Sequence, residues 1–533
     1  MPSFVARRKK PELVLPAQAT PHETLALSDV DDAIDLRFLQ PAIEFFRAVD
    51  IDIDDHGLGR PATAAKVVKA ALAKALVHYY PLAGRLREAA GGKLAVECTG
   101  EGVVFVEAEA DVSMDELGKP SPLPPYPCVE ELLCEVGDPR VVLGVPLFFM
   151  QVTQLRCGGF VIGLHICHNI ADGYGTTQFL KCIADLARTG GDASQIVLPV
   201  WNREILTARI PPHINPEFVG FLQRLGSKGD DVMLSTPPEE MVVRFFLFGP
   251  EDIAALRSHH APAHLSPPAT SFELLTAVMW RCRTVALGYE HHQRVGLMFS
   301  MNVRGGGKRH GLVPHGFYGN ALFYPVADTT AGELSGNPLG YTLGLLREAK
   351  RNLTDDNMES MVDFMASLHG RPPLTIDKMY ERHGLVPHGF YGNALFYPVA
   401  DTPAGELSGN PLGYTLGLIR EAKRNMTDDN MESMVDFMAS LHGRPPLTID
   451  KMYEVSDMKW IGQEALDFRW AKRVGGGLPM VGDISFDSVS CHMRCKNGKG
   501  QDVIVINMIL PGPAMDKFEK EIAVWVCNGQ DEK

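Results

Sequence analysis

One short segment of the sequence contains a histidine that could act as a base. The segment reads HICHNIADG over residues 165–173, and it follows an apolar run that predicts a buried strand over 160–166. His168 therefore stands at the end of a rigid element. Imidazole is neutral near pH 7 and can take a proton from a hydroxyl. Asp172 and Gly173 come four and five residues later, and glycine lets the backbone pass close to the site.

The segment alone does not separate a catalytic histidine from a structural one. The chain has 18 histidines, so chance matches to a His-x-x-x-Asp pattern are expected. His165 and His168 differ in parity along the strand, which points their side chains to opposite faces and argues against a shared metal ion. We expect no metal site. The chain lacks the motifs that are typical of serine hydrolases and P-loop enzymes, because neither Gly-x-Ser-x-Gly nor a Walker loop occurs.

Composition and charge narrow the remaining classes of function. The chain has 533 residues, of which 45% are hydrophobic and 22% charged, so it can bury a large globular core. Its formal net charge of −14 disfavours binding to nucleic acid or anionic membranes. The 10 cysteines are scattered, which suits a reducing compartment, and no apolar run reaches the roughly 18 residues of a membrane span. We expect a cytoplasmic monomer.

A tandem duplication dominates the second half of the chain. Residues 309–381 and 382–454 are copies of 73 residues that differ at three positions, Thr330/Pro403, Leu346/Ile419 and Leu353/Met426. Two long copies do not fit a solenoid, which stacks three or more short repeats. The simplest interpretation is a shorter protein with one block doubled, either in the gene or in the predicted coding sequence.

Each copy has the pattern of one strand followed by two helices. A glycine-rich turn over 316–320 precedes an apolar run, 321–326, that predicts a strand. Asn337 is expected to cap a helix with Pro338 at its first position, and a second helix is expected to start near 354–356. One core accepts one such unit. The other copy must then expose its apolar stripes, self-associate or stay loosely structured.

Elsewhere the hydrophobic pattern alternates between helices and strands. Expected helices cover 63–80, 172–187, 271–284 and 514–525, and an expected strand covers 503–510. The stretch 200–238 has prolines, glycines and mixed charges, as a linker between two halves would. The pattern as a whole predicts an α/β fold in two layers.

Further short strings form a specific set with residues 168–173. They are YYPLAGRL at 79–86, ECTGEGV at 97–103, SFE at 271–273, WRCR at 280–283, NVR at 302–304, and YGN at 318–320 and 391–393. Together they resemble the motifs of the BAHD acyl-CoA-dependent acyltransferases of plants, over nearly the whole chain. The opening residues 4–15 and the string GNPLGY are most similar to the benzyl alcohol O-benzoyltransferase and taxoid acetyltransferase branch.

The resemblance implies a fold and a reaction. The fold would be two similar chloramphenicol-acetyltransferase-like α/β domains, with mixed sheets flanked by helices and a channel between them. They would comprise an N-terminal domain (1–200), a crossover linker (201–238) and a C-terminal domain (239–533) that contains the duplication. The protein would move an acyl group, acetyl or benzoyl, from acyl-CoA as co-substrate to an alcohol or amine. His168 would be the general base, with no bound cofactor and no acyl-enzyme.

The resemblance also implies supporting residues. Asp172 would turn away from the channel and pair with Arg304, which with Gly173 would fix the loop that presents His168. Structural parts on the coenzyme A side would be the turns Tyr318, Gly319, Asn320 and Tyr391, Gly392, Asn393, together with Asp467, Phe468 and Trp470.

One family string is altered in this chain. Its family form is Asp-Phe-Gly-Trp-Gly, whereas residues 467–471 read DFRWA, with Arg469 and Ala471 in place of two glycines. A non-glycine residue that must adopt a positive φ strains its loop by about 1–2 kcal/mol. We therefore expect strain in this loop if either position has that conformation.

Two other interpretations stay open at this point. The duplication and the altered loop could leave a non-catalytic relic that only binds ligands or partners. A carrier-linked condensation domain shares the His-x-x-x-Asp-Gly motif and a similar fold. Those domains usually carry a second histidine directly before the catalytic one, where this chain has Cys167, and no carrier domain is attached here.

Overall fold

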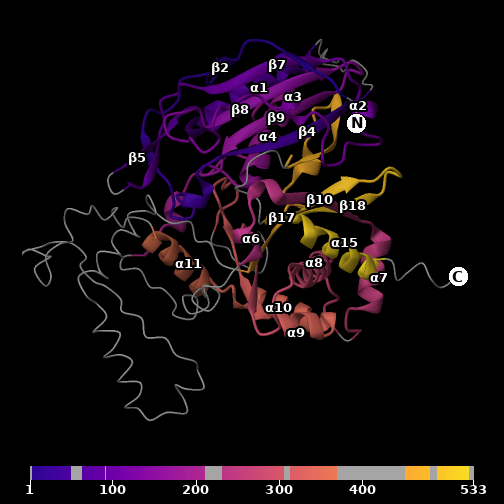
Figure 1. Ribbon diagram of the computed structural model, residues 1–533. Helices are drawn as coiled ribbons and strands as arrows, with labels where there is room; N and C mark the ends of the chain where they lie inside the picture. The colour runs from indigo at the N-terminus through magenta and orange to yellow at the C-terminus, as the bar shows by residue number, and fades with distance from the viewer. Residues whose placement is uncertain are drawn as a thin grey trace, which may run out of the picture. The chain divides into compact units, whose positions relative to one another are not determined.

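The computed structural model describes residues 3–49, 63–89, 92–209, 231–263, 265–304, 313–368, 451–479 and 489–526. Apart from Ser367 and Leu368, these residues belong to one compact unit. The unit contains two large β-sheets with helices packed on them (Figure 1). In the part of the chain described here, no helix is both long and apolar enough to cross a membrane.

The first sheet has the strand order β1-β7-β8-β9-β4-β16, with β2 also paired to β7. Strands β7 and β8 run parallel and the other pairs run antiparallel. The strands are β1 (Ala6–Arg8), β2 (Glu12–Val14), β4 (Leu39–Ala48), β7 (Val103–Ala110), β8 (Phe148–Leu155), β9 (Phe160–Cys167) and β16 (Ala471–Gly477). Helices α1 (Ala64–His78) and α4 (Gly173–Arg188) contact each other, and α1 also contacts β8.

Smaller elements complete this half of the described chain. A three-stranded sheet joins β3 (Thr24–Ala26), β6 (Leu94–Glu97) and β5 (Arg85–Glu88). The short helices are η1 (Ile34–Leu36), η2 (Tyr80–Ala83), α2 (Met114–Leu117), α3 (Val129–Leu132) and η4 (Arg203–Leu206).

Strand β9 is the rigid element that the sequence pattern predicts. All eight of its residues are buried, because β8 and β4 flank it and its two faces are covered. Gly163 lies where α3 comes closest, since a Cβ atom there would be 1.9 Å from the backbone oxygen of Leu132. The strand thus has little freedom to move, and neither has its last residue.

The second sheet has the strand order β10-β18-β17-β15-β11-β14. Strand β15 runs parallel to both of its neighbours, and the remaining pairs are antiparallel, which makes the sheet mixed. Its strands are β10 (Met241–Phe248), β11 (Arg294–Phe299), β14 (Val326–Thr330), β15 (Met452–Asp457), β17 (Val489–Lys496) and β18 (Asp502–Pro511). The helices of this half are α6 (Val232–Ser235), α7 (Pro250–His259), α8 (Ser271–Leu287), α9 (Ala331–Gly336), α10 (Leu339–Asn352), α11 (Asp355–Leu368) and α15 (Gly512–Val526), with η5 (Pro238–Glu240) and η7 (Gln463–Ala465).

Two details of the repeat unit differ from the expectation. The expected strand over 321–326 is wrong as one element, because Pro325, which has no N–H, separates β13 (Leu322–Phe323) from β14. Strand β13 pairs with β12 (Met301–Asn302) instead. The expected cap at Asn337 is also wrong, since Pro338 is the cap of α10 and Asn337 ends the short helix α9.

The described fold combines parts of both copies of the duplication. Strands β13 and β14 and helices α9 to α11 come from residues 313–368 of copy one. The first three residues of β15, Met452–Glu454, are the last three of copy two, and Tyr453 is fully buried in the second core. The expected second turn, Tyr391, Gly392 and Asn393, lies outside the described residues.

Strand β16 links the two halves of the chain. It pairs antiparallel with β4, so that Ala471 lies opposite Ala48 and Gly477 opposite Ile43. The buried carboxylate of Glu44 on β4 forms an ion pair with Arg473 on β16. Residues 471–477, which the predicted boundaries assign to the C-terminal domain, therefore belong to the first sheet. The boundaries at 200 and 239 otherwise stay a prediction.

Thr330 is one of the three positions that distinguish the copies, and it caps α9. Its Oγ1 accepts a hydrogen bond from the backbone N of Glu333 at 3.2 Å. We expect Thr330→Pro, which introduces the residue found at position 403, to lower the free energy of unfolding by about 1 kcal/mol through loss of the cap. The φ of −83° suits proline, so backbone strain adds little.

The measurement is chemical denaturation of the full chain, with Thr330→Ser as the matched control that keeps the hydroxyl. Equal stability of the proline variant and the natural chain would contradict this assignment of the cap.

Candidate active site

His168 directly follows β9 and is held through its backbone. Its N–H donates to the backbone oxygen of Phe38 at 2.9 Å, and its carbonyl accepts from Nδ2 of Asn320 at 2.8 Å. The imidazole lies beside the ring of Phe38, with 5.2 Å between centroids, and stays partly exposed. The backbone that carries the ring is therefore fixed, while the residue as a whole remains partly accessible.

The surroundings of His168 favour the neutral imidazole. Burial lowers its pKa, and this effect is opposed by its own backbone carbonyl, the charge of Asp172 and the side chain of Asn320. A neutral ring can accept a proton at pH 7. His165 is buried on β9, and burial lowers its pKa to about 4. Nothing among the described residues brings three or more metal-ligating side chains together.

Asp172 and Arg304 form a buried pair at the end of the His168 loop. Nη1 of Arg304 donates to Oδ2 of Asp172 at 2.8 Å, and Nη2 donates to Oδ1 at 3.0 Å. The carboxylate also accepts hydrogen bonds from the backbone N of Gly175 and from the backbone N of Ala321. The bond from Gly175 makes Asp172 the N-cap of α4. Because four donors surround it, Asp172 holds the loop in place and is not available as a base.

Glycines allow close contact around this pair. Gly173 begins α4, and a Cβ atom there would lie 3.2 Å from Cε of Met458. At Gly175 a Cβ atom would lie 1.9 Å from the backbone oxygen of Tyr318. Gly175 was not predicted, because it lies two residues beyond the end of the motif at Gly173. A residue without a side chain is required at Gly175 because Tyr318, which is far away in the sequence, packs against it.

The predicted turn Tyr318, Gly319 and Asn320 lies directly behind the His168 loop. Tyr318 is buried, with its ring 5.1 Å from that of Tyr79. Gly319 accepts a hydrogen bond from Arg304 through its oxygen, and a Cβ atom on it would overlap with Nη1 of Arg203. Copy one therefore supplies the turn that contacts His168 in the described fold.

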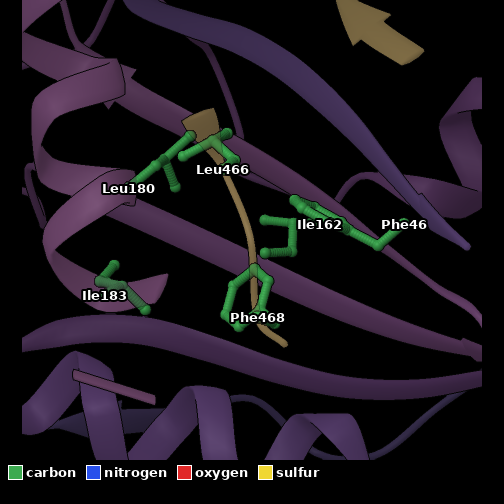
Figure 2. A pocket seen from close by; sticks show the side chains of 6 residues that line it. All are labelled: Phe46, Ile162, Leu180, Ile183, Leu466 and Phe468. Carbon is green, nitrogen blue, oxygen red and sulfur yellow. The ribbon is translucent and has the colours of Figure 1, made fainter. Parts of the chain in front are cut away.

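The altered string at 467–471 lies away from His168. The ring of Phe468 packs 5.1 Å from Phe46 of β4 and 5.4 Å from Phe160 of β9, and Trp470 is buried beside it. Figure 2 shows the small apolar gap between this segment and α4, which is lined by Phe46, Ile162, Leu180, Ile183, Leu466 and Phe468. The gap does not accommodate a water-sized molecule, so it is packing space rather than a substrate site.

Of the two positions where this chain replaces a family glycine, only one has the conformation that glycine favours. Arg469 has a φ of +71°, and its backbone N donates to Oδ1 of Asp467 at 2.7 Å. Ala471 is the first residue of β16 and is not among the described residues with positive φ. The expected strain therefore applies to Arg469.

Sequence comparison places these observations in a family. The model of the Transferase family matches residues 6–382 and 377–524, which is most of the chain. The chain belongs to the BAHD acyltransferase family.

Similar BAHD proteins come from several plants. Acyl transferase 1 of Oryza sativa subsp. japonica is 43% identical, over 100% of this chain and 98% of its own length. Spermidine hydroxycinnamoyltransferase 1 of the same plant is 44% identical, over 95% of each chain. Benzyl alcohol O-benzoyltransferase of Nicotiana tabacum is 38% identical, over 97% of this chain and 93% of its own. The predicted family is confirmed.

Solved structures share the BAHD fold. Vinorine synthase has a TM-score of 0.61 at 20% identity, over 98% of both chains. TRI101 of F. graminearum, solved with coenzyme A and deoxynivalenol, has a TM-score of 0.57 at 14% identity, over 93% of this chain and 97% of its own. These likenesses confirm the α/β fold with mixed sheets flanked by helices.

The left-handed conformation at Arg469 leads to a stability prediction. We expect Arg469→Gly to raise the free energy of unfolding by about 1 kcal/mol, because glycine adopts this φ without steric cost. Ala471→Gly is the matched control: it restores the second family glycine inside a strand and should lower stability by about 0.5–1 kcal/mol. Thermal and chemical unfolding of both variants test this. A destabilised Arg469→Gly variant would show that contacts of the arginine outweigh the strain.

Proposed function

We propose that this BAHD protein is an acyl-CoA-dependent acyltransferase in which His168 is the general base. The observation that supports it best is a partly exposed imidazole whose backbone is fixed at the end of a buried strand. Its loop is clamped by the Asp172–Arg304 pair. A base held in one place can meet a bound acceptor without first being ordered, which lowers the entropic part of the barrier.

The proposed step needs only this one ring. Nδ1 of His168 is buried, which leaves Nε2 to face an acceptor. Nε2 takes the proton of the acceptor hydroxyl or amine while the oxygen or nitrogen of that acceptor attacks the thioester carbonyl. The tetrahedral intermediate then collapses, the C–S bond breaks, and the imidazolium returns its proton to the sulfur of coenzyme A.

Cys167 is a poor candidate for a covalent intermediate. Its side chain is fully buried beside His168, and burial raises its pKa to about 12. A thiol with this pKa is almost entirely protonated at pH 7 and so is a weak nucleophile. The proposed mechanism is therefore direct transfer in a ternary complex.

The relatives suggest the range of substrates. Their names include a hydroxycinnamoyl donor with spermidine and a benzoyl donor with benzyl alcohol. We propose an acyl-CoA donor with an acetyl or aromatic acyl group and a small alcohol or amine acceptor. We further propose that the protein acts as a cytoplasmic monomer.

Removal of the base should slow the reaction while leaving the fold intact. We expect His168→Ala to reduce turnover by about 10²–10⁴-fold, which is the usual contribution of a general base. The assay measures thiol release from acetyl and benzoyl thioesters with a panel of alcohols and amines. His165→Gln is the control, a buried histidine within β9 itself, and should keep its turnover. Full activity of His168→Ala would exclude His168 from the mechanism.

Deletion of residues 382–454 should leave the described site intact. Met379, Tyr380 and Glu381 of copy one would take the place of the identical residues 452–454 at the start of β15. The shorter connection between α11 and β15 should add about 2 kcal/mol of stability through loop-closure entropy. We expect unchanged turnover.

Two other outcomes of this deletion would contradict that expectation. A loss of turnover would show that the second copy contributes to the fold. Activity in the deletion variant alone, with none in the full chain, would identify the full chain as a catalytic relic.

A further inference from the structure

The His168 loop is held by a second charged pair that lies behind it. Asp31, in the segment before η1, is fully buried, and Arg203 of η4 is 2% exposed. Nη1 of Arg203 lies 3.2 Å from Oδ2 of Asp31 and 3.3 Å from Oδ1. These residues are 172 positions apart in the chain and belong to two segments that carry no recognised catalytic motif.

Asp31 connects the loop to the Tyr318–Asn320 turn. Its Oδ1 accepts from both the backbone N and Nδ2 of Asn320, each at 2.8 Å, and Nδ2 also donates to the carbonyl of His168. The backbone oxygen of Asp31 accepts from Nδ2 of Asn169 at 2.6 Å, and Ser28 donates its hydroxyl to Oδ2 at 2.6 Å. The carboxylate thus supports His168 through Asn320, while the backbone oxygen of Asp31 holds Asn169.

Arg203 holds the next residue of the loop. Its Nη2 donates to the backbone oxygen of Ile170 at 2.8 Å. Its guanidinium lies 4.4 Å from the ring centroid of Trp201 and 4.9 Å from that of Tyr318. Such stacking orients the planar group and fixes the direction of its donors.

We propose that Asp31 and Arg203 are positioning residues for the acyl transfer, because their side chains hold His168 through Asn320 and Ile170 directly. The Asp172–Arg304 pair fixes the end of the same loop. Neither side chain is placed to touch a substrate. The proposal rests on His168 as the base. It predicts a defect in the chemical step rather than in substrate binding.

The test is Asp31→Asn, which keeps the shape of the side chain. We expect kcat to fall by about 10–100-fold with little change in KM for either substrate, as is typical for groups that orient a functional residue. A purely structural role would reduce the amount of folded protein and leave the kcat of the folded fraction unchanged.

The pH profile gives a second readout. Among the described residues, the charged groups at the loop are Asp172 within it and Asp31, Arg203 and Arg304 beside it. The negative charge of Asp31 raises the pKa of His168, in opposition to burial. Removing that charge should lower this pKa further, so the acid limb of kcat/KM should move to lower pH in Asp31→Asn.

Two further variants separate positioning from folding. Asp31→Asn with Arg203→Met removes both charges, so no buried charge is left unpaired, and the double variant should fold better than the single one while its kcat stays low. Asp29→Asn is the matched control, since Asp29 is also buried but binds Lys93 and the backbone N of Ala208 instead of the loop. It should retain the natural kcat.

Unchanged kcat in folded Asp31→Asn or in the double variant would overturn the proposal, as would an equal loss in Asp29→Asn. An acid limb that does not move would overturn it as well. Failure of the general-base assignment would appear separately, as full activity of His168→Ala.

Discussion

The bidentate bond between Asp172 and Arg304 is the contact on which the candidate site depends. It joins residues that are 132 positions apart, one at the start of α4 and the other after β12. Because both oxygens of the carboxylate are occupied by fixed donors, the loop from 168 to 172 has a defined end. Strand β9 defines its beginning. The geometry of His168 follows from these two constraints, and the network around Asp31 and Arg203 supports the backbone between them.

Local patterns in the sequence predicted most of the elements around the site. Runs of apolar residues with the right period identified β9, α4, α8 and α15 to within a few residues, because each buries one face or both faces in a core. Contacts between distant segments were less visible. Nothing in the residues near Asp31 or Arg203 shows that they meet, and a buried ion pair has no periodic pattern. The Asp172–Arg304 contact could be expected only from the family resemblance, because the two residues lie in separate motifs, 168–173 and 302–304.

The altered string 467–471 shows where a motif comparison and a structure answer different questions. The sequence identified two missing glycines but did not distinguish them. The backbone does, since Arg469 has a left-handed conformation and Ala471 an extended one within β16. A similar limit applies to the duplication. The nearly identical sequences of the two copies hide which one packs against the core, whereas the described contacts use residues 313–368 of copy one and the last residues of copy two.

Strand β16 has a consequence for biosynthesis. The nascent chain emerges from the ribosome with its N-terminus first. Strand β4 therefore acquires its partner on one side only when residues 471–477 have emerged. Until then the first sheet carries an open edge with unpaired N–H and C=O groups, and such an edge is prone to pair with other nascent chains. The duplicated block lengthens this interval, because its residues must be translated before β16. The first sheet is therefore completed only after the second half of the chain has been synthesised. A longer insert should increase the time during which the nascent chain needs chaperones.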